Sequence, residues 1–252
     1  MVGKGKRPKL IGNHQRCWLW GRHAVVETVQ AGKWLPVEVY VSTDEPASAC
    51  TPFENAGVRV IRESSEALTK LCGKSEHQGW VAKMPEYPYS TLDELLSNLS
   101  LSPFFILLDA IQDPFNFGSI LRSAEVFGVD GVIVAREHQA KVSIHVARSS
   151  VGAVNWLPIA EVDDLVAAAD QLQKTGLNLV AATEKGTLAP SKSPFDQPTV
   201  LMIGNEGTGI RDELLKRVSA QVAIPQSGHI QSLNAAVAAG ILCYEVQRQR
   251  SK

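Results

Sequence analysis

The sequence predicts an α/β protein of two domains, the second of them built on a parallel sheet. Three observations lead to this prediction. Residues 104–109 (FFILLD) are continuously apolar up to the last position, as strands buried on both faces of a parallel sheet are. From there to the C-terminus, strand-like apolar runs alternate with amphipathic helical runs. Residues 85–88 (PEYP) separate this region from a shorter α/β alternation.

The composition is that of an ordinary globular chain. Of its 252 residues, 44% are hydrophobic and 20% charged, and the formal net charge is −1. The basic residues are unevenly spread, because residues 1–23 contain six Lys and Arg and no acidic residue. Such a stretch predicts either a flexible basic arm that contacts nucleic acid or a solvated tail.

Several classes of protein are disfavoured. No apolar run approaches the ~18 residues of a membrane span, and the basic N-terminus lacks the apolar core of a secretory signal. The four cysteines show no CxxC spacing and the six histidines no HxxxH or HExxH spacing. We therefore expect neither a disulfide framework nor a metal site, and a reducing, cytoplasmic location fits.

The first domain is expected to be a small α/β sandwich. Alternating, β-branched segments predict strands at residues 37–42, 58–61 and 79–84. The spacing of apolar residues predicts helices at residues 21–30, 47–56 and 64–72. Pro52 interrupts the second of these helices, and Ser64 or Ser65 is the expected N-cap of the third.

The second domain alternates more regularly. Strands are expected at residues 104–109, 131–135, 156–159, 178–182, 199–203 and 221–224. Helices are expected at residues 91–99, 117–127, 143–150, 162–174, 210–218 and 233–249. Thr91 and Glu94 have the spacing of a capping box at the start of the first of these helices.

These elements predict the division of the chain. A basic arm is expected at residues 1–14 and the first domain at residues 15–84. A linker at residues 85–103 leads to the second domain at residues 104–252. In an open parallel sheet, ligands bind where the strands end, so the loops after the strands of the second domain are the place to look for a site.

The first such loop is residues 108–122 (LDAIQDPFNFGSILR). Asp113 and Pro114 predict a turn, and Asn116 lies at the start of the helix, where backbone N–H groups are free. Arg122 follows six residues later, on the next turns. The alternative is that Asn116 only caps the helix and that Arg122 is an ordinary surface residue.

The second loop is residues 203–209 (IGNEGTG), with three glycines after an apolar strand. It lacks both the GxGxxG pattern and the Lys-Ser/Thr of a phosphate-binding loop. Glu206 would repel a phosphate, so a flat neutral or cationic ligand fits better. The alternative is a simple turn.

The third loop opens residues 224–245 (IPQSGHIQSLNAAVAAGILCYE). Ser232 and Asn234 flank Leu233 at the start of a helix rich in Ala and Gly. Small residues allow two backbones, or a backbone and a flat ligand, to come close. The alternative is that Ser232 caps the helix and the small residues only pack against a neighbour.

Together, and in this order, the three loops resemble the motifs of the SpoU branch of the SPOUT superfamily, the S-adenosylmethionine-dependent RNA ribose 2′-O-methyltransferases. The resembling segments are residues 108–134, 201–210 and 224–245, and the likeness extends over residues 104 to about 248. The resemblance implies a C-terminal trefoil knot that forms the cofactor pocket, and a homodimer whose interface flanks the active site. General rules of topology would argue against a knot, so that expectation depends on the resemblance.

The first domain resembles the N-terminal domain of the large-subunit ribosomal RNA guanosine methyltransferases of this family. The likeness lies in residues 20–32 (WGRHAVVETVQAG) and 76–84 (EHQGWVAKM). It implies an RNA-binding fold like that of ribosomal protein L30e. The matching positions are Gly21, His23, His77, Gln78 and Gly79. Both histidines are equally consistent with ordinary surface or core positions.

The resemblance also implies roles for single residues in a metal-free, in-line attack of a ribose 2′-oxygen on the sulfonium methyl group. Arg122 would lie at the 2′-hydroxyl, and because its pKa exceeds about 12 we expect it to stabilise the developing alkoxide rather than to act as a simple base. The other catalytic and substrate-side residues implied are Asn116, Glu206, Ser232 and Asn234. The residues implied to hold S-adenosylmethionine are Thr183, Gly204, Ile224 and Leu233.

The sequence thus predicts a methyltransferase acting on a guanosine ribose in large-subunit ribosomal RNA. Within the family, a transfer RNA methyltransferase and an antibiotic-resistance ribosomal RNA methyltransferase are alternatives. An RNA-binding or ribosome-assembly protein without catalysis is a third, disfavoured because all five polar motif residues are present. A nicotinamide dehydrogenase is disfavoured by the missing GxGxxG pattern.

Overall fold

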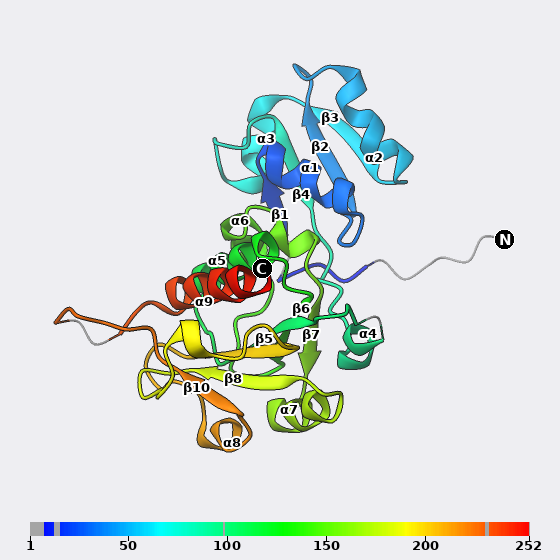
Figure 1. The fold of residues 1–252 in the computed structure, drawn as a ribbon. Helices are drawn as coiled ribbons and strands as arrows, with labels where there is room; N and C mark the ends of the chain where they lie inside the picture. The colour runs from blue at the N-terminus through cyan, green and yellow to red at the C-terminus, as the bar shows by residue number, and fades with distance from the viewer. Residues whose placement is uncertain (1–7, 13–15, 98, 230–231, 252) are drawn as a thin grey trace. The chain divides into compact units, whose positions relative to one another are not determined.

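The computed structural model describes residues 8–12, 16–97, 99–229 and 232–251 (Figure 1). Its internal contacts divide the chain into two compact units. One comprises Met1–Pro88 and Val142–Trp156, and the other comprises Tyr89–Lys141 and Leu157–Lys252. The basic arm expected at residues 1–14 lies mostly outside the described residues. Within the described ranges, no helix is long and apolar enough to cross a membrane.

The first unit contains a four-stranded mixed sheet in the order β1-β4-β2-β3. Its strands are β1 (Trp18–Trp20), β2 (Glu38–Ser42), β3 (Arg59–Glu63) and β4 (Trp80–Lys83). Only β2 and β3 run parallel, and β4 is antiparallel to both of its neighbours. The three strands expected in this region are confirmed, and β1 is added to them.

Short helices cover this sheet. They are α1 (Arg22–Ala31), η1 (Ala47–Cys50), α2 (Thr51–Asn55), α3 (Ser65–Cys72), α6 (Ile144–Ser149) and η2 (Ala153–Asn155). The helix expected at residues 47–56 is split into η1 and α2 near Pro52. Ser64 caps α3 by accepting a hydrogen bond from the backbone N–H of Ala67, as expected.

The second unit contains the predicted parallel sheet, with six strands in the order β10-β8-β9-β5-β6-β7. The strands are β5 (Phe104–Asp109), β6 (Gly131–Ala135), β7 (Ile159–Val162), β8 (Asn178–Ala182), β9 (Thr199–Gly204) and β10 (Ala220–Val222). Strands β5 and β9 are central neighbours, and Asp109 pairs in register with Gly204 at their C-terminal ends. The strand order changes direction there, which is where open α/β sheets bind ligands.

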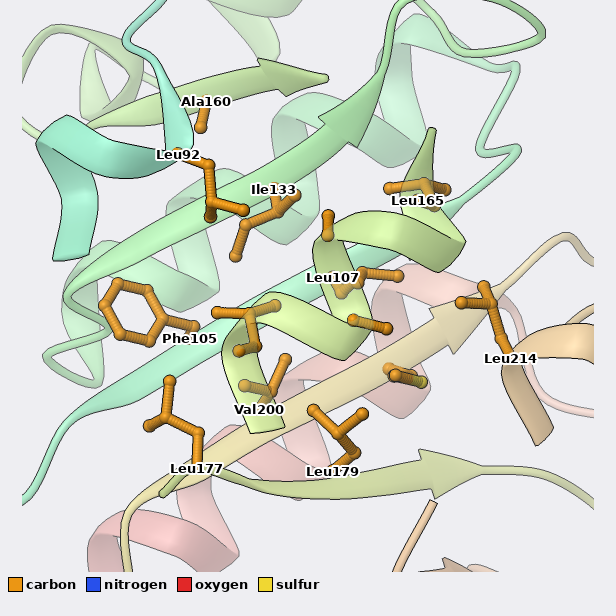
Figure 2. Packing of buried hydrophobic residues seen from close by; sticks show 14 of the residues in the cluster. Leu92, Phe105, Leu107, Ile133, Ala160, Leu165, Leu177, Leu179, Val200 and Leu214 are labelled. Atoms are coloured by element: carbon orange, nitrogen blue, oxygen red, sulfur yellow. The ribbon is translucent and has the colours of Figure 1, made fainter. Parts of the chain in front are cut away.

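Helices cover both faces of this sheet. Figure 1 shows α5 (Pro114–Val126) and α9 (Ala235–Arg250) on one face, and α7 (Leu165–Lys174) with α8 (Asp212–Leu215) on the other. Because strand side chains alternate, Phe105 and Leu107 of β5 point into the cluster beneath α7. In Figure 2 Leu107 and Leu165 lie within the same buried cluster as Val200 of β9.

The helices α5 and α9 pack against each other, with Gly240 facing Ser123. A Cβ at Gly240 would lie 3.4 Å from the Ser123 hydroxyl of α5. Leu242, Cys243 and Val246 fill the buried side of α9, and burial raises the pKa of the Cys243 thiol to about 12. Ala239 is buried in this packing, as one sequence-based interpretation held, while Ala235 and Ala238 line a pocket, as the other allows.

Several predicted boundaries are wrong, and local capping explains the starts of two helices. Helix α5 begins at Pro114, earlier than expected, because Asp113 accepts the Phe115 N–H as N-cap. Helix α9 begins later than expected, and its cap is Asn234 rather than Ser232. The strand expected at residues 156–159 lies at Ile159–Val162, and the helix expected at 210–218 is only Asp212–Leu215. The capping box of Thr91 with Glu94 is present at α4 (Leu92–Leu96).

Candidate functional site

A pocket of about 380 Å³ opens at the C-terminal ends of β8, β9 and β10. Its wall includes the four residues that the sequence suggested for cofactor binding, each from a different segment: Thr183, Gly204, Ile224 and Leu233. Thr183 follows β8, Gly204 ends β9, Ile224 follows β10, and Leu233 precedes α9. The parallel sheet therefore gathers at one edge residues that lie up to fifty positions apart in the sequence.

The charge of the pocket wall favours a cationic ligand over a phosphate. Three carboxylates, those of Glu184, Glu206 and Asp212, line it together with one ammonium group, Lys185. The volume lies in the range of small-molecule sites. S-adenosylmethionine, which carries a sulfonium and an ammonium group beside one carboxylate, has the size and charge that this wall accepts.

The glycine loop after β9 is a tight hairpin. Asn205 and Gly209 exchange two backbone hydrogen bonds of 3.1 and 2.8 Å. A Cβ at Gly204 would lie only 2.3 Å from the carbonyl carbon of Gly209, and Gly209 itself has a φ of 70°. The turn alone therefore requires both glycines, so their presence is no independent sign of a ligand. The loop nevertheless forms one wall of the pocket.

An ion pair between a buried carboxylate and a partly exposed guanidinium joins this hairpin to the end of β5. The Asp109 carboxylate, whose side chain is 3% exposed, accepts hydrogen bonds from Arg211 Nε, Nη2 and the backbone N–H at 2.9, 2.6 and 2.9 Å. The hydrogen bond with Asp109 raises the pKa of Arg211 above its usual range. Such charge-assisted bonds hold the two central strand ends in a fixed relation.

The loop between β5 and α5 is held from both sides. Ala110 has a φ of 61°, a left-handed conformation that is unfavourable for a residue with a Cβ. Its carbonyl accepts from Asn205 Nδ2 at 2.9 Å, and the next N–H, that of Ile111, donates to Gln139 Oε1 at 2.9 Å. These contacts stabilise the strained turn and thereby fix the start of α5.

At the first turn of α5, a chain of polar side chains connects the three motif loops. Asn116 Nδ2 donates to the Glu206 carboxylate in the glycine hairpin. Asn234 Nδ2 donates to Asn116 Oδ1 at 2.9 Å, while Asn234 Oδ1 accepts from the N–H groups of Ala236 and Val237. Asn234 therefore caps α9 and links it to α5 with the same side chain. Both oxygen and nitrogen of Asn116 are used, so its orientation is defined.

The structure places the remaining candidates differently. Arg122 is exposed on α5 and has no hydrogen-bond or ion-pair partner within the part of the chain that the structure describes. Asn116 contacts Glu206 and Asn234 rather than Arg122. Ser232 is exposed and lines the pocket beside Leu233. Of the five polar motif residues, three form one connected group, Ser232 only lines the pocket, and the Arg122 guanidinium has no partner among the described residues.

Sequence reasoning missed the residues that hold the loops. Asp109 carried a signal, since a carboxylate that closes a fully buried strand needs a partner. Arg211 gave no such signal, because it lies 102 positions away. Asn205 lies within the glycine loop of residues 203–209, where the sequence predicts a turn but not the contact with Ala110. The contribution of Gln139 depends on the pairing of β5 with β6.

The two histidines of the first unit have different surroundings. His77 is buried, and its Nδ1 accepts the Gly79 N–H at 3.0 Å. The proton of the neutral ring therefore sits on Nε2, which lies 3.1 Å from Thr69 Oγ1. His77 is a core histidine that shapes its loop. His23 is exposed, with Nδ1 3.8 Å from a carboxylate oxygen of Glu27.

Comparison with known families identifies the fold and the family. Residues 103–244 match the SpoU rRNA Methylase family, and residues 18–90 match the RNA 2′-O ribose methyltransferase substrate binding domain. These two matches place the chain in the class of the RNA ribose methyltransferases. The chain belongs to the SpoU rRNA methylase family.

Individual relatives cover nearly the whole chain. A putative TrmH family tRNA/rRNA methyltransferase of Bacillus subtilis, YacO, is 30% identical over 95% of this chain and 98% of its own length. The 23S rRNA (guanosine-2′-O-)-methyltransferase RlmB of Ralstonia nicotianae is 31% identical over 92% of this chain and 96% of its own length. The crystal structure of the SpoU methyltransferase AviRb of Streptomyces viridochromogenes, in complex with the cofactor AdoMet, superposes with a TM-score of 0.81 at 28% identity, covering 96% of this chain and 95% of that one.

Proposed function

We propose that this protein transfers the methyl group of S-adenosylmethionine to the 2′-hydroxyl of a guanosine ribose in large-subunit ribosomal RNA. The observation that carries the proposal is the connected group of Asn116, Glu206 and Asn234 beside a pocket of about 380 Å³ at the strand ends. It joins a place for a cofactor to side chains that orient a polar substrate. The relative RlmB of Ralstonia nicotianae, named as a 23S rRNA (guanosine-2′-O-)-methyltransferase, supports the choice of RNA and of nucleotide.

The cofactor supplies an electrophilic methyl group on a sulfonium. Thr183, Gly204, Ile224 and Leu233 would hold it, largely through backbone groups at the strand ends. The acidic wall, with Glu184 and Asp212, favours the cationic cofactor over its neutral product. The wall thereby assists both binding and product release.

The chain's own residues would orient and activate the ribose. Arg122 presents donors for the oxygen on which negative charge develops, and its exposed position leaves those donors available to RNA. Asn116, fixed by Glu206 and Asn234, positions the nucleotide relative to the methyl group. Ser232 contributes a hydroxyl at the substrate side of the pocket.

A homodimer is part of this proposal. Val237, Ile241 and Tyr244 of α9 are 50%, 40% and 55% exposed and recur at the spacing of one helical face. Val126 of α5 is exposed as well, and α5 packs on α9. An apolar stripe beside a site is typical of an interface between subunits. The family resemblance adds a trefoil knot at the C-terminus of the same unit.

The remaining assignments follow from the substrate. We propose that residues 15–84 form an L30e-like RNA-binding domain, joined by residues 85–103 to the methyltransferase domain of residues 104–252, with residues 1–14 as a basic arm. The free cysteines of the described chain fit the cytoplasm, where ribosomal RNA is modified.

One experiment tests the function. The protein is incubated with S-adenosylmethionine labelled in the methyl group and with total RNA from cells that lack the enzyme, and the labelled nucleotide is mapped. We expect label at one guanosine 2′-oxygen of large-subunit ribosomal RNA. Label in transfer RNA instead would favour the alternative substrate that the relative YacO's name includes. No label in any RNA would contradict the proposal.

A further inference from the structure

Two cationic side chains lie over the ring of Trp20, at the end of β1. The guanidinium carbon of Arg148 lies 4.0 Å from the centroid of the indole ring, and the ammonium nitrogen of Lys74 lies 5.9 Å from it. The first distance is short enough for the planar guanidinium to stack on the ring. Trp20 is partly exposed, and both cations are exposed, so the cluster belongs to the surface of the first unit.

Three distant chain segments build this cluster. Trp20 belongs to β1, Lys74 follows α3, and Arg148 lies on α6. Helix α6 lies in the range that matches the methylase family, yet Val142–Trp156 packs within the first compact unit. The segment thus adds a cation to a surface whose other residues match the substrate-binding domain.

The two cations of the cluster have no direct counter-ion among the described residues. Within the described ranges, neither Arg148 nor Lys74 has an ion pair with a carboxylate. Arg59 of the same unit offers a contrast, because it pairs with Glu38 at 3.3 Å. Two cations that share one ring repel each other, so the arrangement is favourable when an anion binds there.

The geometry specifies which anion fits. Stacking on Trp20 removes one face of the Arg148 guanidinium from water and reduces its freedom, while the N–H groups at its edge remain donors. A guanidinium held in this way is suited to phosphate, and Lys74 adds a second positive charge. Arg22, two residues after Trp20, extends the basic character, with its backbone N–H donating to Gln78.

We propose that Trp20, Lys74 and Arg148 form a phosphate-binding surface that holds the backbone of the substrate RNA. The inference rests on the proposed function, since it names the surface by which this RNA methyltransferase would grip its substrate away from the reacting ribose. Because phosphate contacts position RNA without reading its sequence, the surface contributes affinity rather than choice of nucleotide.

The test measures RNA binding and needs no methyl transfer. The full-length protein and the variants Arg148→Ala and Lys74→Ala are titrated with a large-subunit ribosomal RNA transcript in filter-binding assays at several salt concentrations. We expect each substitution to weaken binding by about five- to tenfold at moderate salt and to lower the slope of log affinity against log salt by about one. Arg59→Ala is the matched control, and its affinity and slope should stay close to those of the unmodified protein.

A second variant separates the effect of the Trp20 ring from the effect of the two positive charges. Trp20→Leu should weaken binding while leaving the salt slope almost unchanged, because the cations remain but are no longer held in place. Binding of S-adenosylmethionine, measured by calorimetry, and the unfolding temperature show that each variant is folded. If Arg148→Ala and Lys74→Ala bound the transcript as the Arg59→Ala control does, the inference would be wrong. Failure of the proposed function is distinct, since it would show as absent methyl transfer despite normal RNA binding.

Discussion

Arg211 holds the carboxylate of Asp109 with three hydrogen bonds, and this contact fixes the two central strand ends of the parallel sheet. Asp109 closes β5, and Arg211 follows the glycine hairpin that closes β9. The Asp109 side chain is buried, so its charge depends on Arg211 for compensation. The pocket wall and the first turn of α5 both depend on this relation, because one is built on the hairpin and the other on the loop after β5.

Arg211→Ala is expected to lower the free energy of unfolding by about 2–3 kcal/mol, because it leaves a buried carboxylate without its cation. Affinity for S-adenosylmethionine should fall with it, since the hairpin forms a wall of the pocket. Chemical denaturation and calorimetry measure the two effects.

The matched control is Arg136→Ala, which removes an exposed arginine paired with Glu161 at 3.0 Å in the same unit. Arg136→Ala should lower the free energy of unfolding by less than about 1 kcal/mol. Adding Asp109→Asn to Arg211→Ala should recover part of the stability, because a neutral amide is cheaper to bury. Equal losses in the two arginine variants would contradict a structural role for the pair.

Asn116→Asp is expected to slow methyl transfer by about a hundredfold, because it places a second carboxylate against Glu206 and displaces the group that orients the ribose. Glu206→Gln in the same protein restores a donor and should recover much of the rate. Single-turnover methyl transfer with saturating RNA measures this rate. A double variant as slow as Asn116→Asp alone would argue against the contact as the cause.

Arg122→Ala is expected to reduce methyl transfer by about a hundredfold or more, since a donor to the developing alkoxide is lost. Affinity for S-adenosylmethionine should be unchanged, because Arg122 does not line the pocket. Arg122→Lys should recover only part of the rate, as an ammonium group cannot donate in a planar fork. Loss of cofactor binding with retained transfer would overturn this assignment.

Val237→Asp is expected to convert a dimer to monomers, because it places a charge in the exposed apolar stripe of α9. Sedimentation equilibrium measures the molecular mass. Leu101→Asp is the control, since Leu101 is fully exposed on a loop outside that stripe. If the unmodified protein sedimented as a monomer at micromolar concentration, the dimer itself would be refuted.

Local chemistry made much of the fold predictable. The apolar run of β5, the capping box of Thr91 with Glu94 and the Ser64 cap all depend on residues close in sequence. Element ends were less predictable where two polar residues competed for one cap. Asn234 took that place at α9 and Asp113 at α5, because each lies where its side-chain oxygen reaches free N–H groups of the first turn.

By itself, then, the sequence determined the parallel-sheet class, the three loops that carry the polar residues and the family to which the chain belongs. Only the tertiary structure decided which of those residues touch. The pairing of β5 with β9 brings Asp109 to Gly204, and thereby Asn116 to Glu206 across 90 positions of sequence. The contact of Arg148 with Trp20 was likewise decided only by the tertiary structure. Contacts of this kind arise from strand order and helix packing, which no local pattern of residues encodes.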